Sequence, residues 1–170
     1  MGGRRALGLM ARFPQMYPEV TVIGAHFGLA TEVARAERRA QDERWVQMLR
    51  TEGLAPFIKL WERAPIFAAQ ADLPEEILEK QRALRLGQTA GWLADAMKHL
   101  GRGAMPYLLP DLVQAQGRLR YVVGENDTKF GSAGEALCAA RPETTLHKVP
   151  GGHNVLLFED AWAPLQALLA

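Results

Sequence analysis

The sequence is short of three things that would each point to a particular class of protein: cysteine, serine and long apolar runs. The single cysteine, Cys138, excludes an intramolecular disulfide and a cysteine-rich metal site, and its apolar neighbours predict a small buried side chain. No run approaches the ~20 apolar residues that a membrane-spanning helix needs. The charged start, Met-Gly-Gly-Arg-Arg, is unlike a secretory signal peptide. We therefore expect a cytoplasmic protein that does not enter a membrane.

An excess of charge of one sign is also missing. Twenty Lys and Arg residues stand against 19 Asp and Glu residues, which leaves a net charge of +1. This balance does not indicate a basic surface for nucleic acid. Arginines gather between residues 35 and 44, but acidic residues are interleaved with them, which by itself is typical of a solvated helix face. We therefore expect neither a nucleic acid nor a membrane surface as a partner.

Three short segments rich in β-branched residues predict strands over residues 20–24, 119–124 and 144–149. Helical segments follow the second and third strands, over residues 132–140 and 161–169. Alternation of strand and helix is typical of a parallel sheet with crossover helices. The sequence therefore predicts an α/β fold.

A long insertion that reads as all helix separates the first two strands. Its place after a strand of the sheet indicates a cap over an active site. Its expected helices are bounded by Gly and Pro residues and cover residues 31–49, 56–64, 74–86 and 89–100. The expected organisation is residues 1–29 as a first helix and strand, residues 30–113 as the helical cap, and residues 114–170 as the remaining core.

The predicted core is incomplete. A helix over residues 2–13 opens the chain with two glycines and no capping residue, and no strand precedes it. Parallel sheets bury both faces, and three strands are too few for that. We therefore expect a sheet without its first strands, with an exposed edge through which the chain oligomerises or aggregates.

Two loops carry side chains suited to catalysis. Asp127 lies in the loop 124–130 after the second strand, and His153 lies in the loop 150–154 after the third. In this order they match the last two members of a Ser…Asp…His triad, in which the histidine takes the proton of the nucleophile and the acid holds the ring. An aspartate or a histidine alone in such a loop commonly has a structural role; an aspartate after a strand, for example, often caps a helix. Together they predict a triad.

The nucleophile of such a triad lies in a Gly-x-Ser-x-Gly turn between a strand and a helix. The opening Met1-Gly2-Gly3 fits the residues that follow this serine, so we expect the serine directly before Met1, with the helix N-terminus facing the oxyanion. The alternative is an ordinary N-terminal helix. Ser132, the only serine, is expected to cap a helix that begins at Ala133.

Several further segments match one known family. They are Met1-Gly2-Gly3-Arg4, residues 24–29, 36–39 and 42–45, Trp61, and residues 65–68, 83–85, 124–130 and 151–154. Through them the sequence resembles the MenH family, the 2-succinyl-6-hydroxy-2,4-cyclohexadiene-1-carboxylate synthases of menaquinone biosynthesis in the α/β-hydrolase superfamily. The loop motifs are shared by the whole superfamily, whereas the arginines and tryptophans of the insertion are far more specific.

The resemblance implies the C-terminal part of an α/β-hydrolase fold with a helical cap, cut just after the nucleophile. The triad acid falls on Asp127, the histidine on His153, and one oxyanion donor on the backbone of Met1. The implied substrate-binding residues are Arg4, Arg38, Arg85, Trp61 and Phe67.

The implied reaction eliminates pyruvate from 2-succinyl-5-enolpyruvyl-6-hydroxy-3-cyclohexene-1-carboxylate, as a carbon–oxygen lyase without a metal or organic cofactor. This small polycarboxylate suits arginine, whose planar fork pairs with carboxylates. Without a serine nucleophile, the chain alone is expected to be inactive. Two alternatives stay open: a serine hydrolase or esterase, which would need Asp127 and His153 but not the three arginines together, and a non-catalytic remnant.

Overall fold

The computed structural model describes residues 1–169. The chain divides into two compact units, one made of Met1–Phe27 with Tyr107–Ala170 and the other of Gly28–Pro106. We call them the sheet unit and the helical unit, and describe each separately. Within the described residues, no helix is both long enough and apolar enough to cross a membrane.

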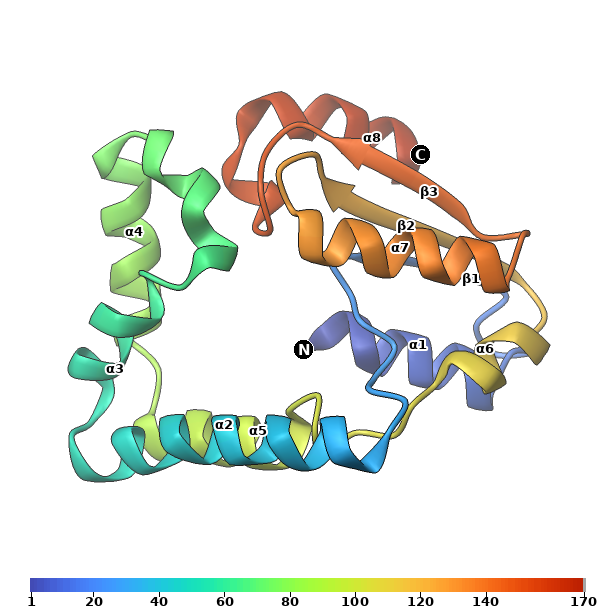
Figure 1. Cartoon of the computed structure of the whole chain (residues 1–170). Helices are drawn as coiled ribbons and strands as arrows, with labels where there is room; N and C mark the ends of the chain where they lie inside the picture. The colour runs from blue at the N-terminus through green and yellow to red at the C-terminus, as the bar shows by residue number, and fades with distance from the viewer. Residues whose placement is uncertain (170) are drawn as a thin grey trace. The chain divides into compact units, whose positions relative to one another are not determined.

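The sheet unit is built on three parallel strands in the order β1-β2-β3 (Figure 1). They are β1 (Glu19–Ile23), β2 (Arg118–Gly124) and β3 (Thr145–Val149). Val22 lies opposite Tyr121, and Tyr121 opposite Leu146. The three predicted strands and their parallel arrangement are therefore confirmed, because β-branched residues on both faces favour a buried strand.

Helices cover both faces of this sheet. Helix α7 (Thr128–Ala140) packs on the Tyr121 face, where Gly134 leaves room for that ring: an added Cβ would lie 2.8 Å from it. Helix α8 (Trp162–Leu169) packs on the opposite face, where Leu165 joins a cluster with Val122. Neighbouring strand residues point to opposite faces, so Tyr121 and Val122 separate the two helices. Two short 3₁₀ turns, Val155–Leu157 and Glu159–Ala161, lead from β3 to α8.

Helix α1 (Gly2–Arg12) lies against β1, as the segment 2–13 predicts (Figure 1). The absence of a side chain at Gly3 lets α1 approach the residues that follow β1, since a Cβ there would come 2.8 Å from the Cβ of Ala25. A Cβ on Gly2 would meet nothing within 4 Å. The short helix α6 (Leu109–Gln114) packs against α1 and α7. One of the two opening glycines is therefore required for packing.

The expected start of the helix after β2 is wrong. Helix α7 begins at Thr128 rather than at Ser132, which lies exposed inside it. The capping residue is Asp127, whose Oδ1 accepts a hydrogen bond from the backbone N–H of Phe130 at 3.2 Å. An aspartate is as good a cap as a serine, and the earlier cap satisfies the first free backbone donors of the helix.

Helix α7 ends at a buried arginine. Arg141 is 3% exposed and donates to the carbonyl oxygens of Ala115 at 3.1 Å and Gly117 at 2.7 Å, and to Oγ1 of Thr144 at 3.2 Å. The acceptors lie just before β2 and just before β3. One side chain thus joins the end of a crossover helix to the starts of two strands.

The helical unit contains α2 (Glu32–Thr51), α3 (Leu54–Trp61), the 3₁₀ helix η1 (Pro65–Asp72), α4 (Glu75–Leu86) and α5 (Ala90–Leu100). Helices α2 and α5 lie side by side. The core of the unit is apolar and consists of Val46, Leu49, Phe57, Ile58, Ala94 and Met97. The four helices expected here are present, while η1 has no counterpart in the prediction because a 3₁₀ helix lacks the 3.6-residue period.

Candidate active site at the ends of β2 and β3

Two backbone hydrogen bonds tie together the loops that follow β2 and β3. The N–H of Glu125 donates to the carbonyl of Val149 at 2.9 Å, and the N–H of Asn126 donates to that of Gly151 at 3.0 Å. Gly124 allows the approach, because a Cβ there would come 2.5 Å from the carbonyl oxygen of Gly151. The sequence therefore folds the two loops into one surface at the carboxyl end of the sheet.

The Asp127 carboxylate connects the two loops through its side chain. It is 5% exposed, and its Oδ2 lies 2.7 Å from Nδ1 of His153. Its other oxygen is the helix cap of α7, so both oxygens are engaged. In the tautomer that donates from Nδ1 to the aspartate, Nε2 of His153 is the nitrogen that can accept a proton from a nucleophile.

The imidazole of His153 is held from two further sides. The ring of Phe130 lies 4.4 Å away between centroids, at an interplanar angle of 35°. On another side is Gly24, which follows β1 with φ +51° and leaves space that a side chain would fill. Residues after all three strands therefore shape the position of one histidine.

Tyr121 is a residue of this site that the sequence reasoning missed. Its side chain is fully buried, and its hydroxyl lies within hydrogen-bond distance of the carbonyl oxygens of Ala25 and, at 3.0 Å, of Phe130. Burial, and then the charge of Asp127, raises the pKa of Tyr121, so the hydroxyl stays protonated and donates. A tyrosine among the apolar residues of a buried strand was the available signal, since a buried hydroxyl needs a partner.

The sheet unit also places the predicted residues of the first helix. Met1 is the N-cap of α1, and Arg4 lies in the first turn. The role of the Met1 backbone as an oxyanion donor, and that of Arg4 in substrate binding, stay predictions. Ser132 is exposed within α7, away from the capping position that Asp127 occupies.

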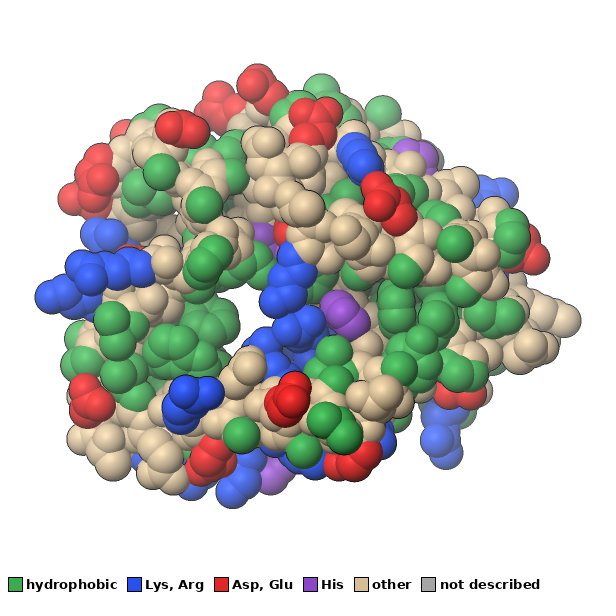
Figure 2. Space-filling view, in the orientation of Figure 1, with side chains coloured by type: hydrophobic (Ala, Val, Ile, Leu, Met, Phe, Trp, Pro, Cys, Tyr) green, Lys and Arg blue, Asp and Glu red, His purple; other side chains and the backbone are tan. Residues whose placement is uncertain are grey.

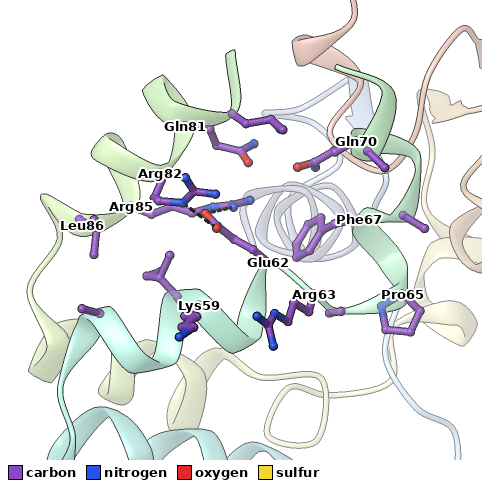
Figure 3. Close-up of a pocket in the computed structure, with 16 residues that line it drawn as sticks. Lys59, Glu62, Arg63, Pro65, Phe67, Gln70, Gln81, Arg82, Arg85 and Leu86 are labelled. Carbon is purple, nitrogen blue, oxygen red and sulfur yellow. Dashed lines mark hydrogen bonds and ion pairs between the residues drawn. The ribbon is translucent and has the colours of Figure 1, made fainter. Parts of the chain in front are cut away.

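The other predicted substrate-binding residues lie in the helical unit, where three of them form one cluster. The rings of Trp61 and Phe67 are 6.0 Å apart, and Cζ of Arg85 lies 5.2 Å from the centroid of the Phe67 ring. Nη1 of Arg85 donates to Oε1 of Glu62 at 3.0 Å (Figure 3). The arginine is thus held over the aromatic ring by a carboxylate.

Arg38 belongs to a separate pair on α2. Its Nε and Nη2 both lie 2.8 Å from Oδ1 of Asp42, which is 4% exposed. A Cβ on Gly101 would come 2.5 Å from Oδ2 of Asp42, so the glycine after α5 makes space for this pair. A guanidinium carries five N–H donors, so pairing with one carboxylate oxygen does not use up its capacity.

Among residues 1–169 the structure contains no group of three or more His, Cys, Asp or Glu side chains arranged to hold a metal ion. Cys138 is partly buried, and its Sγ lies 3.4 Å from the carbonyl oxygen of Thr144. Burial raises the pKa of this thiol, which therefore stays protonated and unreactive.

Comparison with known proteins gives relatives in sequence, although no family model matches the chain. The chain is 31% identical over 155 residues to 2-succinyl-6-hydroxy-2,4-cyclohexadiene-1-carboxylate synthases of Escherichia coli O1:K1 / APEC and of Salmonella heidelberg (strain SL476). These matches cover 91% of the chain and 58% of each relative. The chain therefore spans somewhat more than half the length of the curated relatives.

Solved structures agree with the sequence relatives. The structure of MenH from S. aureus superposes with a TM-score of 0.91 at 26% identity, covering 98% of this chain and 62% of that one. A carboxylesterase structure from Nitrososphaera gargenis superposes with a TM-score of 0.77 at 16% identity, covering 99% of this chain and 61% of that one, and so shows the fold alone. The chain is therefore a MenH homologue with an α/β-hydrolase fold.

Proposed function

We propose that this chain carries the acid and the histidine of a menaquinone-pathway synthase that eliminates pyruvate from 2-succinyl-5-enolpyruvyl-6-hydroxy-3-cyclohexene-1-carboxylate. The observation that carries the proposal is the contact of 2.7 Å between Asp127 and His153, in a chain homologous to MenH. A buried carboxylate on Nδ1 fixes the tautomer of the imidazole and stabilises its protonated form.

The proposed chemistry is general base catalysis. Nε2 of His153 takes the proton of a serine hydroxyl, and the serine oxygen removes a proton from a substrate carbon. The electron pair of that C–H bond forms one double bond of the product diene, the ring double bond shifts by one position, and the C–O bond to the enolpyruvyl group breaks. The electron pair of the C–O bond leaves with the enolate of pyruvate, which takes up a proton on carbon and becomes pyruvate. The negative charge that develops is held by backbone donors at the start of α1, where unpaired N–H groups favour an anion.

The substrate is anionic, and arginine is the side chain best suited to its carboxylates. We propose Arg4, Arg38 and Arg85 for this role, with Trp61 and Phe67 as apolar walls. The cluster of Trp61, Phe67 and Arg85 in the helical unit supports the proposal.

The proposal places the serine directly before Met1, and the 170 residues by themselves are then inactive. Ser132, the only serine in the sequence, is exposed on α7 and follows the cap of that helix. The packing of Gly3 against Ala25 supports a tight turn at this end of α1, as an elbow requires.

The other candidate is an esterase, because the fold and the Asp127–His153 pair would serve it equally well. Ester hydrolysis does not require cationic side chains over an aromatic wall, and this cluster is the observation that favours the synthase. A non-catalytic remnant is the third candidate.

The test begins with the codons upstream of Met1. An in-frame Gly-x-Ser supports the proposal, and a stop codon directly upstream supports the remnant. The complete reading frame is then assayed for pyruvate release from the enolpyruvyl substrate and for hydrolysis of p-nitrophenyl acetate, with His153→Ala as the control. Pyruvate release that depends on His153 is the expected result; ester cleavage without pyruvate release would refute the synthase.

A further inference from the structure

The hydroxyl of Tyr121 joins two segments that are far apart in the sequence. It lies within hydrogen-bond distance of the carbonyl oxygen of Ala25, in the loop after β1, and 3.0 Å from that of Phe130, in the first turn of α7. The tyrosine and both acceptor residues are buried. A phenol has one proton, so the two carbonyl groups share a single donor that water does not readily replace.

Phe130 connects this hydroxyl to the reactive pair. Its backbone N–H donates to Oδ1 of Asp127 at 3.2 Å, and its ring lies 4.4 Å from the imidazole of His153 between centroids. Its carbonyl group is one of the two acceptors of Tyr121. The residue that the hydroxyl holds therefore contacts both the acid and the histidine.

The loop after β1 makes the corresponding connection on another side of the imidazole. Ala25 follows Gly24, where a Cβ would lie 3.1 Å from Cε1 of His153. The N–H of Gly24 donates to the carbonyl of Val122 at 2.9 Å. Two neighbouring residues of β2, Tyr121 and Val122, therefore hold this loop, the first through its side chain and the second through its backbone.

The position of a catalytic base has to be held closely, because a displacement of about 1 Å can lower a rate by about a hundredfold. Elements of regular structure hold a site more precisely than loops do. Tyr121 lies on β2, the central strand of the sheet, and fastens both flanking segments to it.

We infer that Tyr121 is a positioning residue for the reactive pair, and that its hydroxyl acts by fixing the segments on two sides of the His153 ring. With Phe130 and Gly24 held in place, the ring has one position, in which Nδ1 meets Asp127. The hydroxyl does not contact the substrate. In taking Asp127 and His153 as the reactive pair, the inference rests on the proposed function, although an esterase would use the same pair.

The first measurement is hydrogen–deuterium exchange of the 170-residue chain, read by mass spectrometry of its peptides. Tyr121→Phe keeps the ring and removes the hydroxyl. We expect the backbone amides of residues 24–27 and 128–131 to exchange about fivefold faster, the change that the loss of one hydrogen bond would give. Unchanged exchange in both segments would overturn the inference.

The matched control is Leu119→Val. Leu119 is fully buried two residues before Tyr121, on the same face of β2, so this variant loses packing in the same strand and keeps the hydroxyl. Any acceleration of exchange should be spread over the sheet unit, without an excess in the two segments. An equal excess in both variants would show that loss of packing in β2, rather than loss of the hydroxyl, is the cause, and would overturn the inference.

In the complete enzyme, the readout is the division of the effect between kcat and KM, for whichever of pyruvate release and p-nitrophenyl acetate hydrolysis the enzyme catalyses. We expect Tyr121→Phe to lower kcat about tenfold and to leave KM within about twofold, because the position of a base acts on the transition state. Leu119→Val should keep kcat within about twofold of the parent. A raised KM with an unchanged kcat would overturn the inference.

A third variant separates the hydrogen bond from the shape of the ring. Tyr121→4-aminophenylalanine places N–H donors where the hydroxyl was, and it should restore both kcat and slow exchange. A variant of this kind as impaired as Tyr121→Phe would overturn the donor role. Because the exchange measurement needs no catalysis, and the kinetic one serves either reaction, failure of the synthase proposal is distinguishable from failure of this inference.

Discussion

Gly24 lies directly against the imidazole of His153: a Cβ at this glycine would be 3.1 Å from Cε1 and 3.2 Å from Nδ1 of the ring. Its φ of +51° is also a conformation that other residues adopt at a cost. We expect Gly24→Ala to destabilise the chain by about 1–2 kcal/mol, and to displace the ring from Asp127. Urea unfolding measures the first effect, and the loss of pyruvate release by the complete enzyme measures the second.

The control for this variant is Gly131→Ala. Gly131 is helical in α7, and a Cβ there would meet nothing within 4 Å. This variant should be neutral or stabilising by up to about 1 kcal/mol, since alanine favours a helix. Equal effects of the two variants would contradict the contact with His153.

Asp127 has two roles that one pair of variants separates. An asparagine side chain can still cap α7, so Asp127→Asn should change stability little, whereas Asp127→Ala should cost about 1 kcal/mol. In the complete enzyme both should reduce kcat by about 10³-fold or more, because neither presents a carboxylate to Nδ1 of His153. The measurements are urea unfolding and pyruvate release. Near-normal activity of Asp127→Asn would show that the acid acts only as a cap.

The buried guanidinium of Arg141 predicts a large effect on stability. Arg141→Met leaves the carbonyl oxygens of Ala115 and Gly117 without their donor, and we expect a loss of about 3 kcal/mol in the free energy of unfolding. The control is Arg118→Met, whose exposed ion pair with Glu19 is expected to contribute less than about 0.5 kcal/mol. Denaturant unfolding of the three chains checks the difference, and equal midpoints for both variants would be inconsistent with it.

Substitution of Arg38 and substitution of Asp42 should lower the free energy of unfolding by different amounts. Removing the arginine leaves a buried carboxylate uncompensated, whereas removing the carboxylate charge leaves an arginine that reaches solvent. We therefore expect Arg38→Met to cost about 3 kcal/mol and Asp42→Asn about 1 kcal/mol. Arg50→Met, in the exposed pair with Asp95, is the control and should lie within about 0.5 kcal/mol of the parent in urea unfolding. The reverse order for Arg38 and Asp42 would contradict the burial of the carboxylate.

The sheet edge predicts self-association of the 170-residue chain. β1 pairs with β2 on one side, and Leu9, Phe13 and Met16 in and after α1 are exposed. Figure 2 shows hydrophobic side chains gathered over the region of α1 and α6. An open edge beside apolar side chains favours pairing with another chain.

Light scattering after size-exclusion chromatography checks this prediction. The double variant Leu9→Lys/Phe13→Lys should shift the chain toward smaller species, because like charges on the exposed face oppose association. A monodisperse monomer with cooperative thermal unfolding, formed by the unaltered chain, would contradict the prediction.

The strands and most helices were predictable because their signals are local. The β-branched runs and the Gly and Pro boundaries place each element within a few residues. The start of α7 could not be predicted, because Asp127 and Ser132 are both good capping residues. Which of the two caps the helix depends on the geometry of the loop that is hydrogen-bonded to the loop after β3. Local patterns do not contain that distant contact.

The site was predictable only in part. The order of Asp127 and His153 at successive strand ends sufficed to bring them together, because parallel strands end at the same edge of a sheet. A tyrosine in a buried strand signals a buried hydroxyl that needs a partner, but the partners of Tyr121, the carbonyl oxygens of Ala25 and Phe130, could not be found from the sequence. Burial of a polar side chain is a property of the folded molecule.

The loops after β2 and β3 are joined by backbone groups of Glu125, Asn126, Val149 and Gly151, and their side chains take no part in those bonds. The separation of the acid and the histidine is therefore independent of the side chains at 125 and 126. Substitutions at these two exposed positions that keep the backbone conformation should therefore leave the two loops joined and the reactive pair at the same spacing.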